Sequence, residues 1–147
     1  MQALTGRFEH SLDDKNRLFA PSRYRDQLNA EGGKHFMVAM GLERCVYVFL
    51  PSQWERFLAQ VEAYKFKTPQ EKRATMRHIF SNAAEAPLDD QGRILIPQAL
   101  RDHAGLQKEV VVLGAGSRAE LWSKSTLAGM EKSSQKDFQR ISATLDL

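Results

Sequence analysis

The chain has 147 residues, a formal net charge of +3, and 42% hydrophobic and 27% charged residues. This length suits one domain or two small units that share a core, and no apolar stretch approaches the ~20 residues that cross a bilayer. The single cysteine, Cys45, excludes an intramolecular disulfide and a cysteine zinc site. The first ten residues lack the basic and apolar regions of a secretion signal. We therefore expect a cytoplasmic protein with no membrane partner.

The first half of the chain predicts six elements. In chain order they are strands at residues 5–10 and 17–20, a short helix at 22–28, strands at 36–40 and 45–50, and a longer helix. The first two strands flank a turn with the sequence D-D-K-N, which predicts a tight hairpin. Pro21 suits the first turn of the short helix. The spacing of Ser52 and Glu55 predicts a capping box at the start of the longer helix.

A basic helix is expected between the two halves, with its own cap formed by Thr68 and Glu71. Residues 65–78 carry five Lys or Arg residues and one Glu, so this segment has a net charge of 5 − 1 = +4. A solvated helix face explains such a run of charge as well as an acidic partner does. The charge alone therefore leaves both interpretations open.

The second half of the chain repeats the first. Residues 12–28 and 88–104 are identical at seven of 17 positions. We therefore expect a duplication, with units at 1–66 and 77–147 and a linking helix segment at 67–76. The second unit predicts strands at residues 93–96, 110–113 and 119–122, a short helix at 98–103 followed by Gly105, and a C-terminal helix from about Ser125 with Phe138, Ile141 and Leu145 on one face.

An acidic residue and an arginine recur at the same spacing in the turn of each half. Asp13 can pair with Arg17 across the first turn, and Asp89 can pair with Arg93 across the second. A guanidinium held in one direction loses less rotamer entropy on binding. Its fork suits phosphate oxygens or the O6/N7 edge of guanine. The same pair could also serve only to staple a hairpin, so the turns alone leave both roles open.

The tips of the two turns differ in side chain but share one requirement. Asn16 and Gly92 occupy the same place, and both residue types tolerate the positive φ that a tight turn needs. Lys15 lies at the tip of the first turn, where it could reach a phosphate or a guanine. Gln91 takes its place in the second turn and could bind an adenine edge. We therefore expect one backbone shape with two different tips.

Catalytic and metal sites find little support in the sequence. The two turns resemble the paired carboxylates of aspartic proteases, but the D-T-G loop is missing and an Arg follows each Asp, which would keep both acids ionised. The four histidines lack metal-ligand spacing. Cys45 lies in an apolar strand without a nearby His, which is typical of a core residue. We therefore expect no enzymatic activity, no metal and no cofactor.

The doubled motif L-D-x-[KQ]-[NG]-R-[LI]-x-x-P, at residues 12–21 and 88–97, resembles that of the MraZ family, in the AbrB/SpoVT superfamily. H-A-G-L at 103–106 and E-L-W at 120–122 support the resemblance, which covers nearly the whole chain. It implies an α+β, β-rich fold in which two swapped-hairpin ββαββα units form a pseudo-twofold barrel with peripheral helices. It also implies a transcriptional regulator, associated with the nucleoid, that binds short repeated G-rich boxes in the promoter of its own division and cell-wall operon. Ring-shaped homo-oligomers and double-stranded DNA are the implied partners.

The resemblance also assigns roles to residues of this chain. The implied DNA-binding residues are Lys15, Arg17, Gln91 and Arg93, and the implied turn-orienting residues are Asp13, Asp14, Asn16, Asp89, Asp90 and Gly92. Asn16 stands where the family usually has Gly, and Gln91 leaves less charge on the second turn. A different class of function, a non-enzymatic scaffold that binds an acidic protein through residues 65–78, remains the alternative.

Overall fold

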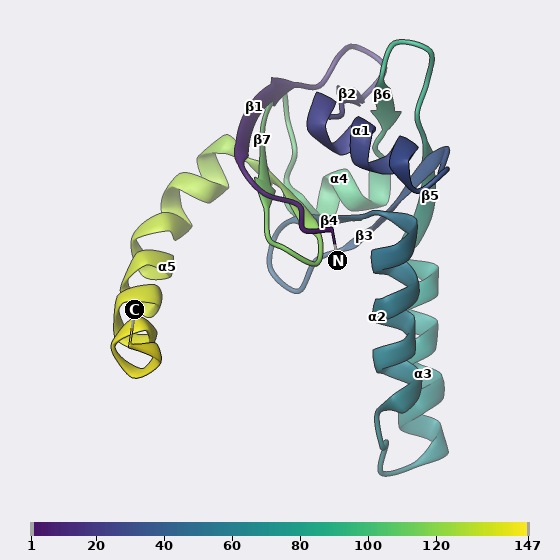
Figure 1. Ribbon diagram of the computed structural model, residues 1–147, viewed down its shortest axis with the longest axis vertical. Coiled ribbons are helices and arrows are strands. Elements are labelled where there is room, and N and C mark those ends of the chain that lie inside the picture. Colours follow the sequence, from purple (N-terminus) through teal and green to yellow (C-terminus); the bar gives the residue numbers. More distant parts are fainter. Residues whose placement is uncertain (1, 147) are drawn as a thin grey trace.

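An antiparallel sheet and a small two-stranded ribbon form the body of the molecule in the computed structural model, which describes residues 2–146 (Figure 1). The strands are β1 (Arg7–Ser11), β2 (Arg17–Phe19), β3 (His35–Met40), β4 (Val46–Phe49), β5 (Ala83–Pro87), β6 (Arg93–Leu95), β7 (Glu109–Gly114) and β8 (Ala119–Ser123). The helices are α1 (Ser22–Ala30), α2 (Pro51–Ala63), α3 (Pro69–Ser81), α4 (Gln98–Ala104) and α5 (Lys124–Leu145). The fold is therefore α+β, as expected.

The two halves of the chain exchange strands. The large sheet has the order β1-β7-β8-β4-β3-β5, so the first strand of each half pairs with the hairpin of the other half. The ribbon pairs β2 with β6. The expected hairpins, β1 with β2 and their counterparts in the second half, are therefore wrong. Exchange places Leu18 opposite Ile94, and both side chains are buried in the shared core. Two strands of three residues could not cover a core of their own.

The short helices begin where the sequence indicates, and α1 ends two residues later than predicted, at Ala30. Pro21 directly precedes α1 and Pro97 directly precedes α4. Gly105 caps the C-terminal end of α4 in the left-handed region, with φ 61°, a conformation that glycine adopts without a Cβ penalty. Tyr24 of α1 is buried, and its hydroxyl donates to the Thr5 carbonyl at 2.9 Å. This contact fixes α1 against the body.

Helices α2 and α3 form a hairpin that extends from one side of the body (Figure 1). The predicted capping box of α2 is wrong, because Ser52 lies inside the helix and binds the Glu31 carboxylate instead. The backbone N–H of Leu50 donates to Gln53 Oε1 at 3.0 Å, so Gln53 supplies the cap. The predicted cap of α3 is confirmed, since Thr68 Oγ1 accepts from the Glu71 N–H at 3.1 Å.

Helix α5 leaves the body on the other side and runs away from the sheet (Figure 1). Leu127, near its start, is buried against Trp122 and Val111. Phe138, Ile141 and Leu145, near its end, are exposed. The predicted helix is thus confirmed. Within residues 2–146, no helix combines the length and the apolar character that a bilayer crossing needs.

Candidate nucleic-acid interface

Asp13 organises the first turn through three hydrogen bonds. Its Oδ1 accepts the backbone N–H groups of Lys15 and Arg17, both at 2.9 Å, and its Oδ2 accepts Arg17 Nε at 2.8 Å. Asn16 closes the turn with φ 61°, and its N–H donates to the Asp13 carbonyl at 2.9 Å. The carboxylate therefore fixes the backbone of the turn and the direction of the Arg17 guanidinium together.

Asp89 organises the second turn in the same way. Its Oδ1 accepts the N–H groups of Gln91 at 2.9 Å and Arg93 at 2.8 Å, and its Oδ2 accepts Arg93 Nε at 2.9 Å. Gly92 stands in the place of Asn16 with φ 83°. The prediction of one backbone shape with two different tips is confirmed. Asp14 and Asp90, the second aspartate of each turn, are exposed.

The two turns are locked to each other by the ribbon. The Ala20 N–H donates to the Gly92 carbonyl at 2.9 Å, and the Ile96 N–H donates to the Asn16 carbonyl at 3.1 Å. Arg93 Nη1 also lies 3.7 Å from Asp13 Oδ2, so Arg93 faces the carboxylates of both turns. The structure thus brings the sequence-predicted residues of both halves onto one surface.

Hydrogen bonding keeps both turn carboxylates ionised. The backbone N–H of Arg17 is the largest influence that lowers the pKa of Asp13 below its ordinary value, and the Arg17 side chain adds to it. The pKa of Asp89 is lowered by the equivalent groups of Arg93. At neutral pH, each carboxylate therefore accepts hydrogen bonds and cannot donate one. An ionised acid that is already bound to an arginine is suited to orienting that arginine, not to donating a proton.

The outer face of the β2–β6 ribbon continues the surface of the turns. Arg17 pairs across the ribbon with Leu95, and Phe19 pairs with Arg93. Because side chains alternate between the faces of a strand, these four residues share the face opposite the buried pair at the centre of the ribbon. Phe19 is 44% exposed and Leu95 is 56% exposed. Sequence reasoning missed both, although the alternation of R-L-F and R-I-L is a signal that could have found them.

A second pair of arginines, Arg25 and Arg101, occupies equivalent positions in the two halves and binds backbone carbonyls beside the ribbon. Arg25 Nε donates to the Ala20 carbonyl at 3.2 Å, and Arg101 Nε donates to the Ile96 carbonyl at 2.9 Å. Arg25 also packs against Gly92, where a Cβ would lie 2.7 Å from Arg25 Nη1. These contacts give Arg25 and Arg101 structural roles.

Other candidate sites lie outside this surface. Burial, followed by the nearby carboxylates of Glu120 and Glu43, raises the pKa of Cys45 to about 12. The thiol therefore stays protonated and packs as a core residue, as predicted. Within the part of the chain that the structure describes, no three His, Cys, Asp or Glu residues gather in a way that could hold a metal ion.

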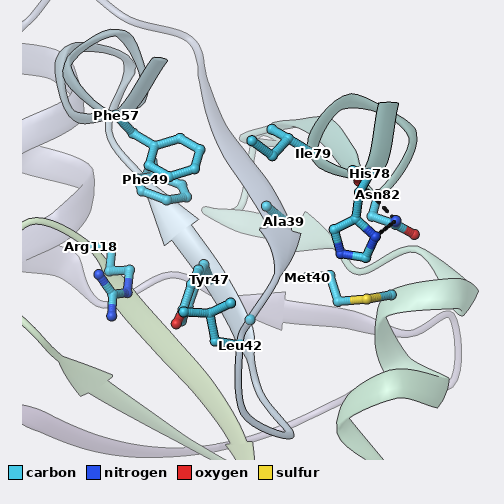
Figure 2. A pocket seen from close by; sticks show the side chains of 11 residues that line it. Ala39, Met40, Leu42, Tyr47, Phe49, Phe57, His78, Ile79, Asn82 and Arg118 are labelled. Carbon is cyan, nitrogen blue, oxygen red and sulfur yellow. Dashed lines mark hydrogen bonds between the residues drawn. The ribbon is translucent and has the colours of Figure 1, made fainter. Parts of the chain in front are cut away.

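An apolar groove of about 190 Å³ lies between the sheet and the α2–α3 hairpin (Figure 2). Apolar side chains from four elements and one turn line it: Met40, Leu42, Tyr47, Phe49, Phe57 and Ile79. Figure 2 shows Arg118 beside Tyr47, and its guanidinium carbon lies 4.1 Å from the centre of that ring. The groove could not be predicted, because its walls are far apart in the sequence.

The basic segment at residues 65–78 does not join the turn surface. It covers the far end of the α2–α3 hairpin and most of α3, which point away from β2 and β6 (Figure 1). Lys72 pairs with Glu62 of α2, with 3.1 Å between Nζ and Oε2. This charge is therefore a separate feature of the molecule.

Comparison with known proteins matches both halves of the chain to one family. The family model described as "MraZ protein, putative antitoxin-like" matches residues 3–77 and again residues 79–147. A transcriptional regulator MraZ from Heliobacterium modesticaldum is 37% identical over 140 residues, which cover 95% of this chain and 94% of the relative. One from Pediococcus pentosaceus is 40% identical over 143 residues, which cover 95% and 94%. The double match also confirms the internal repeat.

Proposed function

Because the chain belongs to the MraZ family, a family of transcriptional regulators and not of enzymes, we propose that it binds double-stranded DNA through its two turns. One observation carries the proposal: two arginines, each held by an aspartate four residues earlier, lie side by side on one surface. A structural staple would need the carboxylate contacts, but it would not need two exposed tips on the same side.

The chemistry of the turns suits a DNA groove. Each aspartate binds the Nε of its arginine, which leaves the terminal N–H groups of Arg17 for a phosphate or the O6/N7 edge of guanine. In Arg93, Nη1 also lies 3.7 Å from Asp13 Oδ2, so this guanidinium is held by both turns. Lys15 adds a phosphate or guanine contact, and Gln91 suits an adenine edge. Asp13, Asp14, Asn16 and their counterparts in the second half set the direction of these side chains. The preferred targets in this proposal are short repeated G-rich boxes in the promoter of the chain's own operon.

Self-assembly is part of the proposal, because one chain offers few phosphate contacts and would bind weakly. A ring of copies on successive boxes gains by effective concentration. The exposed apolar end of α5 and the apolar groove beside the α2–α3 hairpin support such contacts between copies. The exchanged strands likewise support the swapped-hairpin barrel of the superfamily. In the cell, this function places the protein at the nucleoid.

A mobility-shift assay with the chain's own upstream DNA tests the proposal. Wild type, Arg17→Ala and Arg93→Ala are compared in excess nonspecific competitor, with Arg73→Ala on α3 as a matched control. We expect the shift of wild type and Arg73→Ala to survive the competitor, and the shift of both turn variants to be lost while circular dichroism stays unchanged. Folded turn variants that bind as well as wild type would overturn the assignment.

A protein scaffold is the second candidate, and the exposed basic segment at residues 65–78 favours it. Salt dependence separates the two functions. Specific DNA binding weakens steeply with salt yet persists over competitor DNA. A scaffold would show no sequence preference and no requirement for Arg17 or Arg93.

A further inference from the structure

We infer that the outer face of the β2–β6 ribbon reads thymine, with Phe19 and Leu95 contacting the 5-methyl groups of thymine bases in the major groove. The inference rests on the proposed function and deepens it, since it adds two base-reading side chains to the arginines of the turns. It concerns the same surface, but a different chemistry from hydrogen bonding.

The first support is the placement of the two apolar side chains. Phe19 and Leu95 occupy equivalent positions in the two halves, and each lies directly across the ribbon from a turn arginine. The intervening pair, Leu18 and Ile94, is buried. The ribbon therefore buries one apolar pair in the core and presents a second one to the outside, with a guanidinium next to each member.

The second support is the chemistry that such a face can recognise. A two-stranded ribbon fits the major groove, where the 5-methyl of thymine lies beside the donor and acceptor pattern of the bases. Exposed Phe19 and Leu95 have no polar atom to offer a base edge. They match this methyl group, while Arg17 and Arg93 match guanine or phosphate. A face with this alternation distinguishes thymine from cytosine without a hydrogen bond.

The third support is spacing. Residues two apart on a strand are separated by ~6.8 Å, which equals two steps of ~3.4 Å along one DNA strand. A ribbon that lies along the groove therefore sets its apolar contact about two steps from the contact of the arginine on the same strand. Arg93 also lies over the Phe19 ring, with 6.0 Å from its guanidinium carbon to the ring centre, and so positions the ring.

Removing single methyl groups from the DNA tests the inference. Each thymine of the promoter duplex is replaced in turn by deoxyuridine, which pairs identically but lacks the methyl group. Affinities of full-length wild type, Phe19→Ala, Leu95→Ala and Phe19→Leu are measured by fluorescence anisotropy at fixed salt. Tyr64→Ala is the matched control, because Tyr64 is also exposed and directly follows α2. The α2–α3 hairpin extends away from the ribbon (Figure 1).

We expect at least one uracil to weaken wild-type binding roughly fourfold, the worth of one buried methyl group. Phe19→Ala or Leu95→Ala should bind that duplex and its thymine parent equally, whereas Phe19→Leu and Tyr64→Ala should keep the difference. All variants change exposed side chains, and circular dichroism confirms that each is folded.

Four results would overturn the inference. Thymine reading would be wrong if wild type bound every uracil duplex as well as its thymine parent. It would also be wrong if the alanine variants kept the full sensitivity to uracil. In both cases the proposed function stays intact, provided that Arg17→Ala still loses specific binding. If the alanine variants differed from wild type in sedimentation mass but kept its sensitivity to uracil, the face would be a contact between copies. Wild type that shows no competitor-resistant binding would overturn the proposed function and this inference together.

Discussion

The exchange of strands between the halves predicts that the whole chain unfolds as one unit, and Leu18→Ala tests this directly. Leu18 is 1% exposed and lies across the ribbon from Ile94, so one side chain from each half meets at this point. Its truncation removes three carbon atoms, worth about 2.4 kcal/mol at ~0.8 kcal/mol each. The cavity that remains raises the expected loss of unfolding free energy to between about 2.5 and 5 kcal/mol.

Urea unfolding at one fixed protein concentration is the assay, because assembly would make stability depend on concentration. We expect a single transition with an unchanged slope and a lower midpoint for Leu18→Ala. Leu95→Ala is the control on the neighbouring strand, since its side chain is 56% exposed; its cost should stay within about 0.5 kcal/mol.

A double-mutant cycle with Ile94→Ala completes the test. Side chains in contact across the two halves should show a coupling free energy of about 0.5–3 kcal/mol. Two separate transitions, or a loss below about 1 kcal/mol for Leu18→Ala, would refute the reasoning, because each would mean that the halves are stable without this contact.

Three further predictions concern the turns. Gly92→Ala should destabilise the fold by about 1–2 kcal/mol in urea unfolding, because an L-residue is strained in the left-handed region and Gly92 has φ 83°; an unchanged midpoint would contradict this. The hydrogen bonds that lower the pKa of Asp13 and Asp89 favour the ionised form, so their stabilisation is complete above about pH 5 and is lost as the pH falls below about 4. Thermal unfolding of wild type and the double variant Asp13→Asn, Asp89→Asn should therefore differ by a constant amount from pH 5 to 8 and converge in acid; a difference that grows in acid would reverse the argument. Gln91→Lys should steepen the plot of log affinity against log salt by about 1 for each second turn that meets a phosphate, and an unchanged slope would place this tip away from the backbone.

The turns and short helices could be predicted from the sequence because local chemistry determines them. Asn16 and Gly92 tolerate the positive φ of a tight turn, and Pro21 and Pro97 mark the starts of α1 and α4. These signals act over a few residues. They need no knowledge of the rest of the chain.

Strand partners could not be predicted in the same way. The apolar alternation around Leu18 shows which side of a strand is buried, but it carries no information about which strand lies beside it. A tight turn between two strands predicts that these strands pair as a hairpin. Here the strands pair with those of the other half, so this prediction was wrong. The predicted cap of α2 was wrong for a related reason. The Ser52 hydroxyl donates to the Glu31 carboxylate, and a local spacing rule cannot anticipate a contact with a residue so far away in the sequence.

Duplication within one chain permits the two turns to differ, which two identical chains could not do. Arg93 faces the carboxylates of both Asp89 and Asp13, and its side chain is 18% exposed; the Arg17 side chain is 29% exposed. The first turn also carries Lys15, where the second has an uncharged glutamine. In the proposed function, the first turn is therefore suited to the stronger phosphate or guanine contact. The second turn, held more tightly, is then suited to setting the register of the pair on DNA.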